Sequence, residues 1–426
     1  MNLVRLASLS FGRPLWVLLS GILFSHLGYY LILPLLAIIL TAEKGLSAGT
    51  VGTVLGTGSI AYLSGSLLGG GLTDRLGQRR TLVLGLILRA VGLLGYGFAN
   101  TLPLLFASSI LTGLGGGIYT PPAKAGIATF ATEQNKSTAF SFRGIAANIG
   151  ITVGPLIGAL LAGTSLALFI AGSLIFAGLA LTHRLLLPAD CANPPCETPD
   201  RRASFEILKD RPFLVFSLVT VFIWALYAQF TFSIPLRAAD ILPNPKSVGL
   251  LWSFTSIMII FMQAPITRFT STRLHPLLIL AAGTVIMGIG LGSVIWSSGF
   301  YDLLLSVAIF TLGEMLVMPT VDTVVSELAE PQLIGTYFGI ASLVWGLGES
   351  LGNVGGGQLI NAAKAWTAPT LPWVVFAAAG GLLGLVLYGL HMWPALASPL
   401  RGALTKRSER TLSPTVSWRK KRGENK

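Results

Sequence analysis

The chain has 426 residues, of which 53% are hydrophobic and only 11% are charged, whereas soluble domains carry about 25% charged residues. A soluble protein of this length could not cover its surface with so few charges. Apolar runs of about 20 residues, enough to cross a membrane, follow one another almost throughout. They are continuously apolar and do not alternate as barrel strands do. The composition therefore indicates a polytopic α-helical membrane protein.

Twelve apolar runs predict twelve transmembrane helices. In chain order they are residues 15–40, 51–72, 81–99, 104–130, 141–163, 165–187, 212–237, 247–269, 276–297, 302–326, 336–360 and 372–394. The predicted domains are a first six-helix bundle (1–187), a proline-containing cytoplasmic linker (188–211), a second six-helix bundle (212–394) and a basic cytoplasmic tail (395–426).

The formal net charge is +12, and the placement of the basic residues indicates membrane topology and not nucleic-acid binding. Nine of the 29 basic residues follow Pro394, and most of the others fall in alternate loops. The positive-inside rule places these loops and both termini in the cytoplasm. The partner expected for the basic tail is anionic membrane lipid.

The two halves of the sequence resemble each other. A shift of 198 residues aligns Arg75 with Arg273 and Pro121 with Pro319, and it aligns a series of glycines at 150, 154 and 158 with glycines at 348, 352 and 356. An ungapped register across several helices predicts a duplication. The fold class is thus an all-α membrane protein of two pseudo-symmetric six-helix bundles, which suits a site between halves that rock against each other.

Two motifs stand out in the first half. The loop after the second run reads Gly70-Gly71-Leu72-Thr73-Asp74-Arg75-Leu76-Gly77-Gln78-Arg79-Arg80. In the fifth run, Gly150, Gly154 and Gly158 form a stripe on one helix face that allows close approach of a neighbour, and Pro155 should bend the helix.

These motifs resemble the major facilitator superfamily. The loop is similar to its signature Gly-x-Leu-Ala-Asp-Arg-x-Gly-Arg-Lys, with departures at Thr73 and Gln78. The resemblance implies that Asp74, Arg75 and Arg79 latch the two halves together on the cytoplasmic side; the counterpart Thr272-Arg273 lacks the acid, so the latch is one-sided. The stripe with Pro155 is similar to the motif of drug/proton antiporters, in the branch that includes multidrug and siderophore exporters.

Ionisable residues inside a membrane are costly and usually face a cavity or a partner. Glu314, Glu349 and His26 are the candidates for proton coupling, with Glu314 placed first because it lies near the middle of its run. Arg89 is a candidate for substrate contact, although it could simply hold helices together. Lys124 and Asp322 are related by the 198-residue shift, which fits a salt bridge at the inner end.

Several further side chains are candidates for lining a substrate cavity. They are mostly aromatic and suit an amphiphilic ligand: Tyr30, Tyr119, Asn148, Trp224, Tyr227 and Trp345. Cys191, Cys196 and four scattered histidines offer no metal-site spacing, so no metal or other cofactor is expected.

The resulting hypothesis is a proton-coupled antiporter that exports a small amphiphilic molecule, a drug or a siderophore, by alternating access. Its energy source would be the proton motive force, and its location the bacterial cytoplasmic membrane as a monomer. The alternative on the same fold is a proton-coupled symporter that imports a sugar or another metabolite. An enzyme is disfavoured because no nucleophile or metal constellation is present in the sequence.

Overall fold

The structure, a computed structural model, describes residues 11–132, 136–161, 164–188, 207–244, 247–330, 333–398 and 400. These residues are overwhelmingly helical and include no strand, as the sequence predicted. The helices are α2 (Arg13–Tyr30), α3 (Leu33–Ala42), α4 (Ala48–Leu76), α5 (Gln78–Phe98), α6 (Leu102–Phe130), α7 (Lys136–Leu161), α8 (Ser165–Leu186), η1 (Ile207–Lys209), α10 (Arg211–Thr231), α11 (Ser233–Ile241), α12 (Ser247–Ser271), α13 (Pro276–Ser293), η2 (Val294–Trp296), α14 (Phe300–Leu328), α15 (Ile334–Ala365) and α16 (Leu371–His391).

Eleven of the described helical segments are long and apolar enough to span a membrane. Two of them are the pairs α2–α3 and α10–α11, each of which forms one broken span. Among the described helices of comparable length, only α15 is not in this group; it has 32 residues but mixes apolar side chains with glycines, Glu349 and Asn353. With α15 included, the segments correspond one by one to the twelve predicted runs.

The first span of each half is broken at a proline. Pro34 has no N–H to donate to the carbonyl of Tyr30, and Pro235 has none for the carbonyl of Thr231. Tyr30 and Thr231 are the last residues of α2 and α10, and both line the cavity described below. Interrupted helices are tolerated in a membrane where the irregular backbone faces a cavity.

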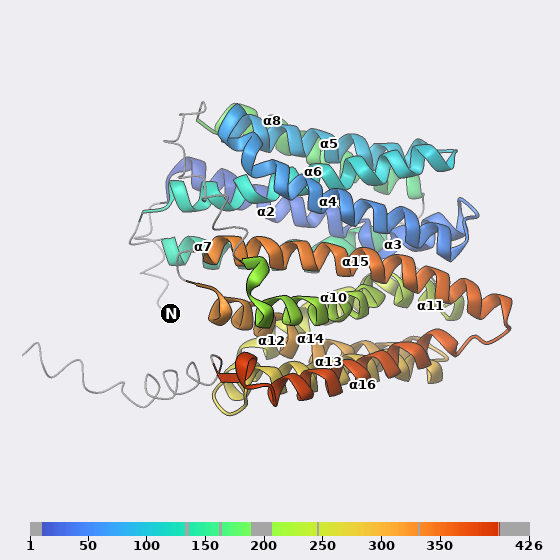
Figure 1. The fold of residues 1–426 in the computed structure, drawn as a ribbon. Helices are drawn as coiled ribbons and strands as arrows, with labels where there is room; N and C mark the ends of the chain where they lie inside the picture. The colour runs from blue at the N-terminus through green and yellow to red at the C-terminus, as the bar shows by residue number, and fades with distance from the viewer. Residues whose placement is uncertain are drawn as a thin grey trace, which may run out of the picture.

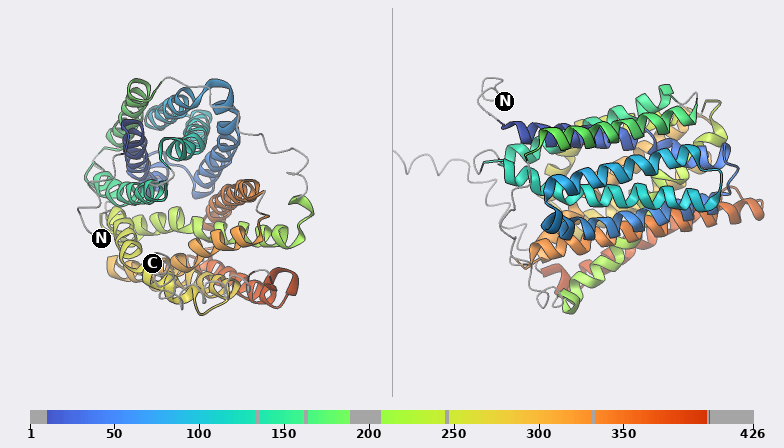
Figure 2. Two further views of the ribbon diagram at one scale, coloured as in Figure 1. Left: turned by 90° about the vertical axis from the view of Figure 1, so that its left-hand side faces the viewer. Right: turned by 90° about the horizontal axis from the view of Figure 1, so that it is seen from above.

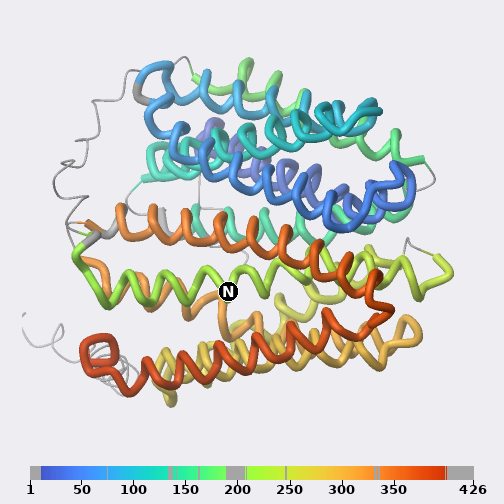
Figure 3. The backbone as a smooth tube through the Cα atoms, turned by 45° about the vertical axis from the view of Figure 1, so that its right-hand side comes forward, coloured from blue at the N-terminus to red at the C-terminus, as the bar shows by residue number. Residues whose placement is uncertain are grey.

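The described helices form two groups, one from each half of the chain. In Figure 1, α2 to α8 (blue to green) lie in the upper part and α10 to α16 (light green to red) in the lower part. The groups meet along α4 with α15 and α7 with α12. The left view of Figure 2 shows the helices of the first half nearly end-on and several helices of the second half inclined to them, and in Figure 3 α15 (orange) lies next to α4 (blue).

Within each half, glycines bring two helices into backbone contact. A Cβ added to Gly154 on α7 would lie 2.8 Å from the carbonyl oxygen of Leu27 on α2, and one added to Gly352 on α15 would lie 2.8 Å from Cα of Ala225 on α10. Real Cβ atoms do not come so close, so no side chain fits at either position. The 198-residue shift relates the two contacts, because it superposes α2 on α10 and α7 on α15. Backbone contacts of the same type occur at Gly150, Gly158 and Gly348, whereas a Cβ at Gly356 would meet the side chain of Gln229 on α10.

The halves meet at one end of the molecule and separate at the other. Asn361 Nδ2 donates to Ser47 Oγ at 3.2 Å between α15 and α4, and Ser253 Oγ donates to the carbonyl of Thr152 at 3.1 Å between α12 and α7. Toward the opposite end of α4, a Cβ added to Gly71 would meet no atom within 4 Å, and the same holds at positions 144 and 339. The open end carries the basic loops that the sequence places in the cytoplasm.

Candidate functional site

A cavity of about 230 Å³ lies between the two halves. Its walls come from α2 to α7 of the first half, with contributions from α10 and α15 of the second. Three basic side chains and one carboxylate line it: Arg89, Lys124, Arg143 and Glu349. The cavity therefore has both signs of charge on its wall, with an excess of positive charge.

Arg89 is a buried cation with aromatic neighbours and no carboxylate partner among the described residues. Its side chain is only 8% exposed. The guanidinium carbon lies 4.3 Å from the ring centroid of Tyr29 and 5.1 Å from that of Phe176, and Nε has no hydrogen-bond partner. Gly116 leaves the room for it, since a Cβ there would be 3.0 Å from Cζ. Cation–π contacts are worth about 0.5–2 kcal/mol, less than the several kcal/mol that burying a charge costs, so Arg89 is under-compensated.

Glu349 lines the same cavity from α15, near its middle. It lies beside Ser59 of α4, across the contact between the halves, and the helices are close there because a Cβ on Gly346 would be 3.6 Å from the carbonyl oxygen of Ser59. Glu349 is therefore a carboxylate at the interface between the halves and not inside one bundle.

Glu314 lies elsewhere, buried inside the second half and 8% exposed. Its Oε1 accepts a hydrogen bond from the hydroxyl of Tyr227 at 3.2 Å, and its Oε2 has no partner. Phe310 packs against Tyr227 and Phe230, with ring centroids 6.0 and 5.3 Å apart. Glu314 is absent from the cavity wall, so it and Glu349 occupy different environments.

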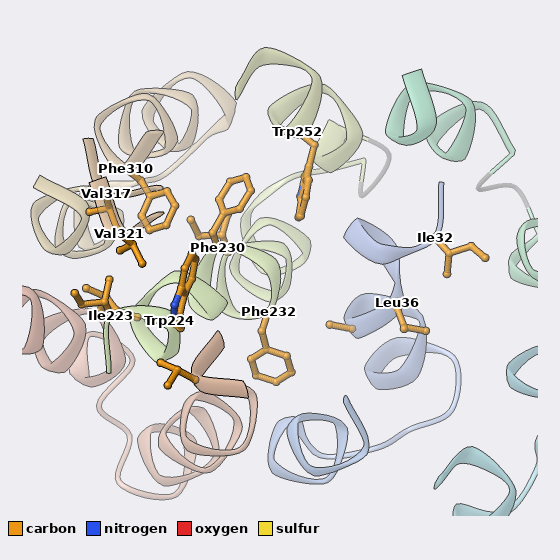
Figure 4. Packing of buried hydrophobic residues seen from close by; sticks show 14 of the residues in the cluster. Ile32, Leu36, Ile223, Trp224, Phe230, Phe232, Trp252, Phe310, Val317 and Val321 are labelled. Atoms are coloured by element: carbon orange, nitrogen blue, oxygen red, sulfur yellow. The ribbon is translucent and has the colours of Figure 1, made fainter. Parts of the chain in front are cut away.

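A row of aromatic rings connects these two regions. Phe230 lies 4.6 Å from Trp252, and Trp252 lies 5.8 Å from Tyr30 in the cavity wall (centroid distances). Figure 4 shows Phe230 and Phe310 close together, with the Trp252 side chain directed towards them. The row crosses from the second half to the first, so a movement of one half against the other must slide or separate Trp252 and Tyr30.

The internal repeat relates the two buried charges in an unexpected way. The shift that superposes the halves pairs Tyr29 with Tyr227, and Gly116 with Glu314. In the first half the tyrosine ring packs on Arg89 of α5, and in the second half the tyrosine hydroxyl bonds to Glu314 of α14. A charge therefore lies next to the equivalent tyrosine in each half, but the two charges have opposite signs and come from helices that the repeat does not superpose.

Four further predicted site residues also line the cavity: His26, Tyr30, Tyr119 and Trp345. The Nδ1–H of His26 donates to the carbonyl of Ile22 at 2.8 Å, and the ring stacks with that of Tyr30 at a centroid distance of 6.3 Å. The Trp345 ring meets that of Tyr62 edge-on at 5.5 Å. The hydroxyl of Tyr119 is buried without a hydrogen-bond partner.

Three other candidates are placed away from this cavity. Asn148 is exposed on α7 and donates to the carbonyl of Gly144 in its own helix at 2.9 Å. Trp224 is buried in the second half, where it packs edge-on against Tyr227 at 5.7 Å. Tyr227 donates its hydroxyl hydrogen bond to Glu314, as described above.

The loop between α4 and α5 is tightly built. Gly77 has φ of 88°, a conformation that favours glycine, and it separates the two helices. Gln78, one of the departures from the signature, donates from Nε2 to the carbonyl of Pro122 at 2.8 Å and so ties the loop to α6. Arg75 is exposed and Arg79 half-buried. The side chain of Asp74 lies outside the described residues, so the latch stays a prediction.

The predicted salt bridge between Lys124 and Asp322 is not formed in this open arrangement. Both side chains are exposed, and their N and O atoms are not within the 4.0 Å of an ion pair. The physical reason is that the two halves are apart at this end. Lys124 instead lines the cavity.

Ser59, Tyr62 and Asn353 line the cavity but were missed by the sequence analysis. Ser59 and Tyr62 lie on α4, and Asn353 is one turn beyond Glu349 on α15. Helical spacing from Glu349 could have suggested Asn353. Nothing in the apolar run of α4 distinguishes the face that meets α15.

A comparison with known families decides the class of protein. The sequence model of the Major Facilitator Superfamily matches residues 18–353. The chain belongs to this superfamily. It is therefore a multi-pass membrane transporter, as the signature loop and the repeat suggested.

Similar proteins include two bacterial relatives named multidrug resistance protein MdtH. The one from Cronobacter sakazakii is 29% identical over 368 residues, which is 86% of this chain and 90% of the relative. The one from Aeromonas salmonicida is 29% identical over 385 residues, which is 90% of this chain and 96% of the relative.

Solved structures share the fold. The nucleoside transporter NupG superposes with a TM-score of 0.76 at 15% identity, covering 89% of this chain and 99% of that one. A peptide transporter POT in complex with sulfate superposes with a TM-score of 0.73 at 17% identity, covering 91% and 96%. At this identity the likeness concerns the fold alone.

Proposed function

We propose that the chain is a proton-coupled exporter of small amphiphilic molecules in the bacterial cytoplasmic membrane, with both termini inside. The observation that carries the proposal is one cavity between the halves, closed at one end and open towards the side of the basic loops, with Glu349 on its wall. The relatives named for multidrug resistance support export over the import of a metabolite.

Glu349 is the carboxylate best placed to couple protons to substrate. It lines the cavity, whereas Glu314 is enclosed with Tyr227 and aromatic rings in the second half. An ionised carboxylate without a partner is unfavourable in a membrane, so Glu349 needs either a proton or a positively charged group. Competition between the two on one carboxylate exchanges a proton for a substrate. This reverses the order of the two glutamates expected from the sequence.

Alternating access then requires the open end to close. Lys124 and Asp322 lie on α6 and α14, at corresponding positions of the two halves, and are unpaired with each other in the open arrangement. Closure would bring opposite charges together at the inner end, while the contacts of Ser47 with Asn361 and of Ser253 with Thr152 would break at the other. Shifting such an equilibrium needs only a few kcal/mol of differential interaction.

The test is flux in inverted membrane vesicles, whose interior corresponds to the outside of the cell. An inside-acid pH gradient should drive accumulation of rhodamine 110, a fluorescent dye with an amine-bearing ring system and a carboxylate. Vesicles without the protein and vesicles treated with a protonophore are the controls. Accumulation that is unaffected by the protonophore, or that runs only in the opposite direction, would contradict proton-coupled export and favour the importer alternative.

A further inference from the structure

Arg89 has no role in the proton exchange just described. It is more than nine-tenths buried, its Nε is unpartnered, and it lies on the wall of the cavity among aromatic rings. A buried guanidinium without a carboxylate is under-compensated, and a guanidinium fork is suited to bind a carboxylate, sulfonate or phosphate in two places. The cavity thus presents an anion-binding group that no described side chain satisfies.

We infer that the cavity binds flat amphoteric molecules, whose anionic group pairs with Arg89 and whose cationic group pairs with Glu349. The assignment rests on the proposed export function and names its substrate class. Tyr29, Arg89 and Glu349 line the same cavity, and the Tyr29 ring lies 4.3 Å from the Arg89 guanidinium. The two charges thus line one aromatic compartment.

Whether the proton and the substrate move in the same or in opposite directions depends on the charge of the substrate. A purely anionic substrate would bind Arg89 better when Glu349 is protonated, because an ionised Glu349 repels it; proton and substrate would then travel together. A cationic group on the substrate competes with the proton for Glu349, as exchange requires. A substrate with both groups uses Arg89 for binding and Glu349 for coupling.

The remaining charged and titratable groups of the cavity agree with this assignment. Lys124 of α6 and Arg143 of α7 line it nearer the open end, where positive charge attracts an anionic group from the cytoplasm. His26 on α2 uses its Nδ1–H in a hydrogen bond to the carbonyl of Ile22. Glu349 is the one carboxylate in the wall of the cavity among the described residues, so the cationic group has one place to bind.

Aromatic rings around the cavity suit a planar body between the two charged groups. Tyr29 and Tyr30 come from α2, and the Tyr62–Trp345 pair joins the two halves beside Glu349. Rings bind flat molecules by stacking and edge contacts. Because Trp345 and Tyr62 touch each other across the two halves, a planar ligand that packs against this pair would contact both halves.

Three dyes with one ring system separate the contributions. Rhodamine 110 is amphoteric, rhodamine 123 is its methyl ester and therefore only cationic, and fluorescein is only anionic. Binding is measured by fluorescence anisotropy on the full chain in lipid nanodiscs, without any gradient. We expect rhodamine 110 to bind at least about ten-fold more tightly than either of the other dyes.

Variants then assign each group. Arg89→Met introduces the residue that the repeat places at the equivalent position of the second half, Met287, which is fully buried there. It should abolish the preference for rhodamine 110 over rhodamine 123, while Glu349→Gln should abolish the preference for rhodamine 110 over fluorescein. Arg184→Met, at an exposed position on α8, is the matched control and should leave both preferences unchanged.

The outcomes separate this inference from the proposed function. Equal binding of the three dyes, a preference for rhodamine 123 or fluorescein, no binding at all, or an unchanged preference in folded Arg89→Met would each overturn the amphoteric assignment. Binding with the expected preferences but without gradient-driven flux in vesicles would instead overturn proton-coupled export and leave the binding assignment standing.

Discussion

Each half places a charge next to the same tyrosine of the repeated scaffold, but the charges come from different helices and lie in different surroundings. In the first half, Tyr29 offers its ring face to Arg89, and the guanidinium lines the cavity. In the second half, Tyr227 offers its hydroxyl to Glu314, and Phe230 and Phe310 pack around this pair. The comparison teaches that duplication preserved the helix packing while the polar contents diverged: the charge next to this tyrosine lines the cavity in the first half and is enclosed in the second.

The largest difference should appear between substitutions of the two glutamates, Glu349 in the cavity wall and Glu314 inside the second half. Glu349→Gln removes the proton site but keeps the size of the side chain, so gradient-driven export should be abolished. Glu314→Gln can still accept a hydrogen bond from Tyr227 and should retain export within about three-fold, because the group lies outside the cavity; such a change is below the roughly 1.4 kcal/mol that ten-fold represents. Dye flux in inverted vesicles measures both, and the opposite pattern would assign the proton to Glu314.

A second test compares how much the close helix contacts at the glycines contribute to stability and transport in each half. Leucine at Gly154 or at Gly352 must push apart a pair of helices whose backbones touch, and overpacking of this kind costs about 1–3 kcal/mol. Both variants should lower the unfolding temperature by similar amounts and impair transport. Gly178→Leu on α8, where an added Cβ meets no atom within 4 Å, is the control. A large effect in only one half would show that the repeat is not mechanically equivalent.

The loops after the second helix of each half differ in the same manner. Asp74 has no acidic counterpart, since Thr272 occupies the equivalent position and its hydroxyl donates to the carbonyl of Arg268 at 3.0 Å. Asp74→Asn should slow turnover roughly ten-fold, equivalent to about 1.4 kcal/mol on the barrier, with unchanged amounts of folded protein. Thr272→Val should have little effect. Normal turnover of Asp74→Asn would reduce the loop to a topological signal.

The smallest effects should come from the paired tyrosines. Tyr227→Phe removes the donor to a buried carboxylate and should destabilise the protein by about 1 kcal/mol. Tyr29→Phe retains the ring face that Arg89 contacts and should change stability by less than about 0.5 kcal/mol. Thermal unfolding in nanodiscs measures both. Equal losses would show that Tyr29 contributes through its hydroxyl and not through its ring.

The sequence predicted the helices well because membrane spans depend on the length and polarity of a run, which are local properties. It predicted less of the site, because these runs are apolar all round and do not show which face meets the cavity. Glu314 and Glu349 both lie near mid-helix, yet only packing places one at the interface and the other in a bundle. Asn148 and Trp224 illustrate the same limit. The repeat alone shows that Tyr29 and Tyr227 are equivalent. Their different charged neighbours, Arg89 and Glu314, become visible only from the contacts in the structure.

The mixed polarity of α15 has a consequence for how the chain enters the membrane. Insertion favours segments of high hydropathy, and among the long described helices α15 alone falls below that level. Its glycines at 348, 352 and 356 are buried against α10, so the helix reaches a favourable environment only after its neighbours are in place. We therefore expect α15 to be the last helix to settle during synthesis, held in the bilayer by α10 and α4. A nascent chain that ends just after Ala365 would depend on those contacts to keep the helix across the membrane.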